Sequence, residues 1–192
     1  MNSKHLELCS SAEWAQTVEQ YVIPWTLEGL DLGDDVVELG PGPGCTTDVL
    51  RNLAPQLTAL EINHDLAEGL ARRMAGTGVT VVHGDATDMP FPDGRFSAAL
   101  ALTMLHHVPT AELQDSLFRE AARVLRPGGL FAGTDSLDSA DFRELHTDDI
   151  CVPLEPAGLQ ARLEGAGFTD VAVDSNPYAV RFRAAKPAPA SS

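Results

Sequence analysis

Glycines and carboxylates are spaced in this chain as a bound nucleotide would require. The turn 40–44 has glycine at its first, third and fifth positions, and it follows the apolar run Val36-Val37 and the carboxylate of Glu38. Because glycine has no side chain, such a backbone can approach a ligand closely and adopt positive φ. The segment 45–54 has helical character, so the turn also leads into a helix N-terminus. A strand, a glycine-rich turn and a helix in this order indicate a nucleotide-cofactor site.

The glycine spacing distinguishes this turn from two other nucleotide-binding motifs. A dinucleotide fingerprint has the form G-x-G-x-x-G/A, but Cys45 stands where its third small residue would fall, and the third glycine comes one position early, at Gly44. No Gly-Lys-Ser/Thr follows, so the turn is not a P-loop. On this motif alone, a tight turn without a ligand is the alternative.

Two further carboxylates stand where later strands are predicted to end. Glu61 follows the apolar run 57–60, and Asp85 follows the run 79–83. In a parallel sheet, ligands bind beyond the carboxyl ends of the strands. Glu61 could accept hydrogen bonds from both hydroxyls of a ribose. A dinucleotide-binding enzyme would need the same acid, so Glu61 does not distinguish between cofactors. The alternative to a ribose-binding role is that Glu61 is simply a solvent-exposed acid at the end of a strand. Asp85 follows Gly84, and this pair is also favourable turn chemistry.

The elements that would position these residues alternate along most of the chain. Apolar runs predict strands at 36–39, 57–60, 79–83, 96–102 and 130–134. Helical patterns predict helices at 45–54, 65–74, 111–125 and 159–166. This alternation is typical of a parallel sheet with helices on both faces. Only a short turn joins the runs 171–174 and 179–183, so we expect them to pair antiparallel. The prediction is an α/β domain with a mostly parallel, seven-stranded sheet and an antiparallel C-terminal hairpin.

The N-terminal segment 1–33 has helical but no strand patterning. A capping box, Ser10-x-x-Glu13, opens a helix that we expect Pro24 to break or kink. The apolar stripe of this helix has no strand partner of its own, so we expect the segment to be a lid over the carboxyl edge of the sheet, although it could simply cover a sheet face. The stripe consists of Trp14, Val18 and Tyr21. The cofactor-binding domain would span 34–185, and the Pro/Ala/Ser-rich tail 186–192 is expected to be disordered.

The charge balance restricts the classes of partner. The 192 residues include 13 Lys and Arg against 28 Asp and Glu, a net charge of −15. A protein that binds nucleic acid requires a basic face, and an anionic membrane repels an acidic protein surface. We therefore expect the partner to be a small molecule or a protein. The cysteines form no zinc pattern, and no membrane span or secretory signal is evident, which favours a cytoplasmic protein. The oligomeric state stays open.

Several motifs, taken in order, resemble the class I S-adenosylmethionine-dependent methyltransferases. The segment Glu38–Gly44 matches the E-x-G-x-G-x-G form of their motif I. The segments Asp85–Phe96, Leu105–Val108 and Val124–Gly129 resemble the small-molecule group of the ubiquinone/menaquinone-biosynthesis type, methyltransferase type 11. The resemblance covers roughly 34–183 and implies a Rossmann-like fold with S-adenosylmethionine as cofactor.

The resemblance assigns roles at the methionine end of this cofactor. Glu38 would orient the glycine-rich turn or bind the ammonium group, and the backbone of 40–44 would line the methionine moiety. Thr103, just after the predicted strand 96–102, would lie near the same moiety.

At the adenosine end, the resemblance implies that Glu61 holds the ribose and Ile62 packs on the adenine face. Asp85 would accept from the exocyclic amine, and the N–H of Ala86 would donate to a ring nitrogen. The candidate cofactor-binding residues are Glu38, Gly40, Pro41, Gly42, Gly44, Glu61, Ile62, Asp85, Ala86 and Thr103.

The expected activity is methyl transfer to an O, N or C atom of a small molecule. The alternatives are a non-catalytic S-adenosylmethionine-binding regulatory protein on the same fold and a nicotinamide-dependent oxidoreductase, which the glycine spacing disfavours. The catalytic residue is open, because His106 and His107 could each act as a general base or be structural. We interpret His146, Asp148 and Asp149 as a solvated face and expect no metal site.

Overall fold

The computed structural model describes residues 2–188 and contains one seven-stranded sheet with the strand order β3-β2-β1-β4-β5-β7-β6. Neighbouring strands from β3 to β5 pair parallel, whereas β7 pairs antiparallel with both β5 and β6. The predicted α/β fold with its antiparallel C-terminal hairpin is thereby confirmed. The strands are β1 (Asp35–Leu39), β2 (Gln56–Glu61), β3 (Thr80–His83), β4 (Phe96–Leu102), β5 (Leu125–Ser136), β6 (Thr169–Ser175) and β7 (Ala179–Ala185).

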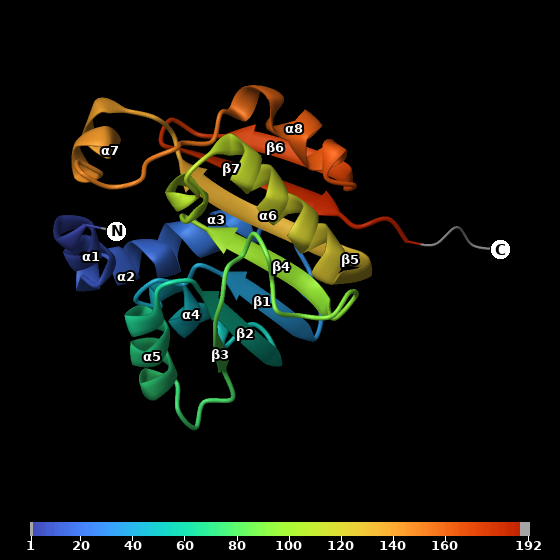
Figure 1. Cartoon of the computed structure of the whole chain (residues 1–192), viewed down its shortest axis with the longest axis horizontal. Coiled ribbons are helices and arrows are strands. Elements are labelled where there is room, and N and C mark those ends of the chain that lie inside the picture. Colours follow the sequence, from blue (N-terminus) through green and yellow to red (C-terminus); the bar gives the residue numbers. More distant parts are fainter. Residues whose placement is uncertain (1, 189–192) are drawn as a thin grey trace.

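Helical segments precede, connect and flank these strands. The parallel strands point towards the end of the sheet at which α1, α2 and α7 gather (Figure 1). The helical elements are α1 (Ser3–Cys9), α2 (Ala12–Thr17), the π-helix η1 (Val18–Val22), α3 (Ile23–Thr26), α4 (Cys45–Leu50), α5 (His64–Arg73), the 3-10 helix η2 (Leu105–His107), α6 (Ala111–Val124), α7 (Ala140–Leu145) and α8 (Pro156–Gly165).

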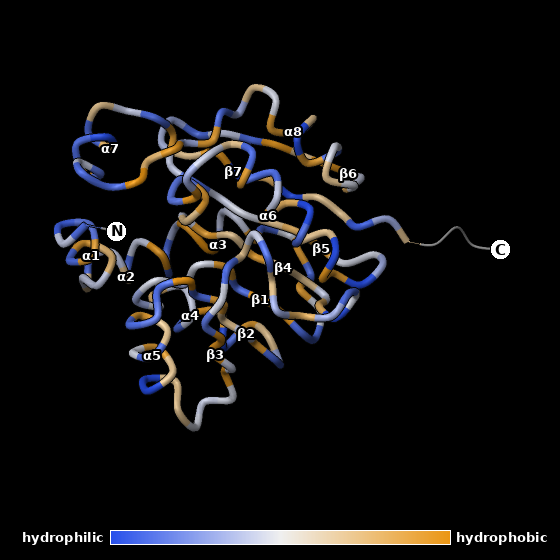
Figure 2. Tube along the Cα trace, viewed as in Figure 1, coloured by the Kyte–Doolittle hydropathy of each residue, from blue (hydrophilic) through white to orange (hydrophobic). Residues whose placement is uncertain are grey.

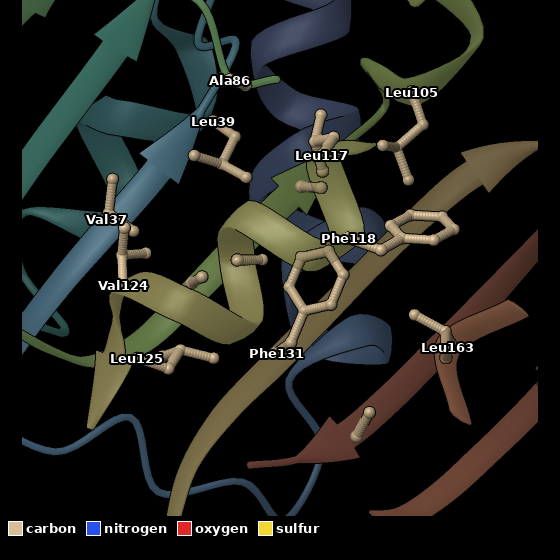
Figure 3. Close-up of a cluster of buried hydrophobic side chains, with 14 of the residues drawn as sticks. Val37, Leu39, Ala86, Leu105, Leu117, Phe118, Val124, Leu125, Phe131 and Leu163 are labelled. Atoms are coloured by element: carbon tan, nitrogen blue, oxygen red, sulfur yellow. The ribbon is translucent and has the colours of Figure 1, made fainter. Parts of the chain in front are cut away.

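Alternate residues of the central strands pack into two separate hydrophobic clusters. In β1, Val37 lies in a cluster with Leu117 and Phe118 of α6, whereas Val36 lies in a cluster with Leu50 of α4. Successive side chains of a strand point to opposite faces, so the two clusters are the two faces of the sheet. Figure 3 shows the α6 side. Hydrophobic residues concentrate along the central strands in Figure 2.

The N-terminal segment divides its stripe between the core and the surface. Val18 is fully buried in the cluster that contains Val36, and Ile23 is buried there too. Tyr21, by contrast, is 67% exposed. The segment therefore covers a face of the sheet at Val18 and Ile23, as expected if it were not a lid. Its other face is free to line a cavity.

Local details of this segment differ from the predictions. The N-cap of α2 is Ser11, whose side chain accepts from the backbone N–H of Trp14, and not Ser10. Pro24 does not end the helical run, because it stands in the first turn of α3, where an intrahelical N–H partner is not required. The π-helix η1 directly precedes α3, and its i→i+5 hydrogen bonds change the hydrogen-bonding register of the helical run before Pro24.

Three elements extend or add to the predicted pattern. Strand β5 begins at Leu125 and not at 130, because the N–H of Gly128 donates to the carbonyl of Lys186 and the N–H of Lys186 donates to Gly129. The expected disordered tail thus begins with a paired residue, and its positions 189–192 lie outside the described residues. The short helices α1 and α7 were not predicted. Among residues 2–188, no helix combines the length and hydropathy needed to span a bilayer.

Candidate active site

The glycine-rich turn adopts a backbone that only glycine tolerates well. Gly40, Gly42 and Gly44 all have positive φ, at 61°, 55° and 90°. A Cβ on Gly40 would lie 2.9 Å from the Met104 side chain, so Gly40 also allows the loop after β4 to pack closely. Pro41 and Pro43 have no N–H, and the N–H groups of Gly40, Gly42 and Gly44 donate to Leu60, Glu61 and Pro41 within the protein. The turn is therefore fixed by its own hydrogen bonds, and α4 begins directly after it.

Glu38 is buried beneath this turn and braces the helix that follows it. Its Oε1 accepts from the hydroxyl of Thr46, and its Oε2 accepts from the hydroxyl of Thr47 at 2.6 Å. Burial raises the pKa of Glu38 to about 7, although the two hydroxyl donors act in the opposite direction. Glu38 thus holds the first turn of α4, directly after the glycine-rich turn, and both of its predicted roles stay predictions.

Glu61, at the end of β2, is buried and holds the same turn from the other side. Its Oε2 accepts from the backbone N–H of Gly42 at 2.9 Å, and its Oε1 accepts from the N–H of Asn63 at 2.8 Å. Each carboxylate oxygen has two lone pairs, so the group retains capacity for two further donors. The alternative of a solvent-exposed acid is excluded, because Glu61 is only 5% exposed.

Three of the four predicted adenosine residues, Ile62, Asp85 and Ala86, line a cavity of about 190 Å³, whereas Glu61 is not part of its wall. Ile62 is 63% exposed at its edge, which is unusual for a large apolar side chain and suits a stacking surface for a flat ring. Asp85 lies on the same wall, where its Oδ1 accepts from the N–H and hydroxyl of Thr87. The predicted turn role of Asp85 is thus present, and its Oδ2 takes no part in those two bonds.

A row of three cavities runs along the carboxyl edge of the sheet. The adenosine-side cavity shares Gly40, Met104 and His107 with a narrow central cavity of about 50 Å³. The central cavity, which Pro41 and Gly42 also line, shares Trp14 and Thr103 with a large cavity of about 620 Å³.

Thr103 stands at the junction of the central and large cavities. It is one of three non-glycine residues with positive φ among those described. Its N–H donates to the carbonyl of Thr134 at the end of β5, which fixes the chain as it leaves the sheet. A strained residue at such a junction is a common feature of functional sites.

The large cavity is mostly apolar and takes its walls from segments far apart in sequence. Trp14, Tyr21 and Trp25 come from the N-terminal helices, and Tyr178 comes from the turn between β6 and β7. Polar residues on its wall come from the end of β5, at Thr134, Asp135 and Ser136, and from other segments that include Thr17, Gln20, Thr103 and Asn176. The aromatic residues of 1–33 thus line a cavity beside the predicted cofactor cleft.

A cluster of histidines next to the central cavity was not predicted. His5, His106, His107 and His146 offer ring nitrogens that lie within 4.8 Å of one another. Only His106 and His107 are neighbours in sequence, so spacing gave no signal for the group. The interpretation of His146 as part of a solvated face is wrong, because its side chain is only 3% exposed.

Burial and the neighbouring rings keep members of this cluster neutral. The pKa of His5 falls to about 4 and that of His107 to about 3, with burial as the main cause and the other imidazoles adding to it. Burial also lowers the pKa of His146. Near neutral pH, these rings therefore carry free lone pairs and no charge.

Comparison with known proteins decides the family. Residues 37–133, just over half of the chain, match the model of a methyltransferase domain. The chain belongs to the class I S-adenosylmethionine-dependent methyltransferases. It is 40% identical over 131 residues to a fatty-acid O-methyltransferase of Mycolicibacterium smegmatis, an alignment that covers 67% of this chain and 47% of the relative.

The chain is also similar to other methyltransferases. A sterol 4-C-methyltransferase of Caenorhabditis elegans is 30% identical over 121 residues, covering 60% of this chain and 35% of the relative. The chain thus spans about half or less of the length of these curated relatives. An S-adenosylmethionine-dependent methyltransferase structure from Aquifex aeolicus shares the fold with a TM-score of 0.67 and 16% identity, covering 92% of this chain and 98% of that one.

Proposed function

We propose that this methyltransferase binds S-adenosylmethionine along the row of cavities and transfers the methyl group to an oxygen atom of an apolar small molecule. The observation that carries the proposal is the continuity of the row. A cavity lined by Ile62, Asp85 and Ala86, a narrow centre and a large chamber follow one another, with Thr103 and Trp14 shared by the last two. Predicted cofactor residues from the glycine-rich turn and from the segments after β2 and β3 line the first two, so the third is assigned to the acceptor.

The residues fit the cofactor group by group. Glu61 has lone pairs available for the ribose hydroxyls, and Asp85 with the N–H of Ala86 would read the edge of adenine, while Ile62 covers its face. The backbone of the glycine-rich turn would line the methionine moiety. The methyl group of the sulfonium would then lie near Thr103.

The acceptor class follows from the walls of the large cavity. Aromatic side chains from the N-terminal helices and the β6–β7 turn dominate it, so it favours an apolar molecule. Relatives named for fatty-acid and sterol substrates support an acceptor of this kind. In the reaction, a lone pair of the acceptor oxygen forms the new C–O bond while the C–S bond breaks and its electron pair stays on sulfur. The protein's part is to align the two molecules and exclude water.

Calorimetry and product analysis test the proposal in turn. The cofactor and S-adenosylhomocysteine should bind with similar heats, and NAD should not bind. Release of S-adenosylhomocysteine is then measured with a fatty acid, a sterol and a hydrophilic amine. Methylation of an apolar acceptor is expected. Tight binding of NAD alone would contradict the assignment of the cofactor. Turnover of only the hydrophilic amine would contradict the proposal of an apolar acceptor. Cofactor binding without turnover of any acceptor would favour the regulatory alternative.

A filled-cavity variant locates the acceptor. Ala179→Phe places a ring in the large cavity and should raise the KM for the acceptor at least several-fold while the Kd of the cofactor stays unchanged. Leu53→Phe, at a residue 52% exposed and outside every cavity wall named above, is the matched control. Equal effects of the two variants would mean that the acceptor binds elsewhere.

A further inference from the structure

Four imidazole rings from three separate segments converge beside the central cavity. His5 belongs to α1, His106 and His107 to η2, and His146 follows α7. The ring centroids of His5 and His146 lie 4.4 Å apart, and those of His106 and His107 lie 4.2 Å apart. Side chains of this type seldom gather by chance, because each ring brings a polar nitrogen that burial must satisfy.

Each ring presents a buried nitrogen that has no hydrogen-bond partner among the described residues. These atoms are Nδ1 of His5 and Nε2 of His106, His107 and His146. A buried polar atom without a partner typically costs about 1–3 kcal/mol. Four such atoms at one place are therefore a strong indication of a missing electrophilic partner.

Two of the rings are held from behind, which fixes where their free nitrogens point. The Nδ1 of His106 lies 2.6 Å from Oδ1 of Asp135, whose other oxygen accepts from the backbone N–H of His106. The Nδ1 of His146 donates to the carbonyl of Phe142 at 2.7 Å. A carboxylate or carbonyl behind a histidine is the usual support of a metal ligand, because it sets the tautomer and leaves Nε2 to the metal.

We propose that His5, His106, His107 and His146 bind one divalent transition-metal ion, with Zn²⁺ as the best fit. Imidazole nitrogens are preferred ligands of Zn²⁺, and four of them complete a tetrahedral shell. The ligand atoms lie within 4.8 Å of one another, whereas a tetrahedral site with ordinary Zn–N bonds requires about 3.4 Å. Small side-chain rotations would close the difference.

The charges around the cluster suit a divalent cation. Asp135 is fully buried behind His106, and Asp149 has an oxygen 4.0 Å from Nδ1 of His5. Asp135 would offset part of the positive charge of the ion, whereas Asp149 already accepts from the backbone N–H of Asn2.

Such an ion would tie α1 and the segment after α7 to the end of β4. His107 also lines the central and adenosine-side cavities, so the metal would fix one wall of the predicted cofactor cleft. The four ligands are themselves sufficient to fill a tetrahedral shell, so we assign the ion a structural role in closing the site and no part in methyl transfer.

Metal titration of the untagged protein tests the proposal. After removal of metals with a chelator, Co²⁺ is added as a spectroscopic probe, and Zn²⁺ is then used to displace it. We expect one ion per chain, the intense visible absorption of four-coordinate Co²⁺ with nitrogen ligands, and a higher melting temperature with Zn²⁺. Absence of binding, or a weak six-coordinate spectrum, would overturn the proposal.

The remaining two of the six histidines provide the control. His64 and His83 pair with each other at a centroid distance of 5.3 Å and are exposed, so His64→Gln and His83→Gln should leave the Co²⁺ spectrum unchanged. His107→Gln and His146→Gln should abolish it, and Asp135→Asn should weaken binding by about 10–100-fold. Equal binding by all five variants would overturn the assignment of the ligands.

Cofactor calorimetry on both the metal-free and the Zn²⁺-treated protein keeps the two proposals separate. Binding of S-adenosylmethionine by a protein that gives no metal spectrum leaves the proposed function intact and rejects the metal site. A four-coordinate Co²⁺ spectrum, with no cofactor binding by the Zn²⁺-treated protein, rejects the cofactor assignment and retains the metal site.

Discussion

Oε2 of Glu61 lies 2.9 Å from the backbone nitrogen of Gly42, so the carboxylate proposed for the ribose also fixes the glycine-rich turn. The two functions do not compete, because the same oxygen has a second lone pair and Oε1 has another. The ribose contact and the shape of the methionine subsite are thereby coupled through one side chain. Loss of Glu61 should affect both ends of the cofactor.

We expect Glu61→Ala and Asp85→Ala each to weaken S-adenosylmethionine binding by tenfold or more. Loss of a hydrogen-bonded charged partner typically costs about 1.5–3 kcal/mol. Asp65→Ala, at a side chain that is 98% exposed, is the control. Calorimetric Kd values measure the effect, and circular dichroism verifies the fold. Unchanged affinity in both variants with the fold intact would contradict the assignment.

Glu38 should make stability depend on pH in an unusual direction. Its pKa rises to about 7 in the native state, so the native state binds its proton more tightly than the unfolded chain. The contribution of Glu38 to stability therefore decreases as pH rises from about 4.5 to about 7, by on the order of 3 kcal/mol, and is constant above that. Glu38→Gln removes this term. Urea unfolding of both proteins from about pH 5 to about pH 8 measures it, and a pH-independent difference would refute the prediction.

Two glycine substitutions should act in opposite directions. A Cβ on Gly133, in β5, would lie 2.5 Å from the carbonyl oxygen of Ala101 and 2.6 Å from the ring of Phe182, so Gly133→Ala should destabilise by about 2 kcal/mol or more. Gly69 lies within α5 with open space around it, so Gly69→Ala should stabilise by about 0.5–1 kcal/mol. Thermal and urea unfolding measure both. A stable Gly133→Ala protein would show that β4 and β5 can separate locally.

Core and cavity roles of the N-terminal segment should separate by residue. Val18→Ala removes buried methyl groups and should cost about 1–2 kcal/mol of stability without altering the KM for the acceptor. Tyr21→Ala, at an exposed residue that lines the large cavity, should raise that KM and leave stability unchanged. Deletion of 1–25 should impair both. An equal fall in melting temperature for Tyr21→Ala and Val18→Ala would contradict this separation of core and cavity roles.

The sheet could be predicted because its determinants are local. The apolar runs, the glycine-rich turn and the short link before β7 each lie within a few residues of chain, and the fold followed their order. Errors arose where partners distant in sequence decided the outcome. Strand β5 gained five residues through pairing with Lys186, and the cap of α2 moved by one residue to Ser11.

The positions of the candidate site residues could be predicted in the same way. Glu61 and Asp85 lie at or just after the ends of neighbouring strands because a parallel sheet brings its carboxyl ends together, and their roles towards the cofactor stay predictions. The histidine cluster could not be found in this way. His5 and His146 meet only because α1 and the segment after α7 fold over the same edge, and neither helix had a recognisable sequence pattern.

The position of β7 has a consequence for how the protein is made. This strand is the last in sequence, yet it lies inside the sheet between β5 and β6, and the large cavity takes Tyr178 and Ala179 from its beginning. During synthesis from the N-terminus, the residues proposed for the cofactor are all present before this strand leaves the ribosome. The acceptor chamber is therefore completed later than the set of nucleoside-binding residues. A nascent chain that stops short of β7 would have its nucleoside-binding residues but would lack a wall of the acceptor chamber.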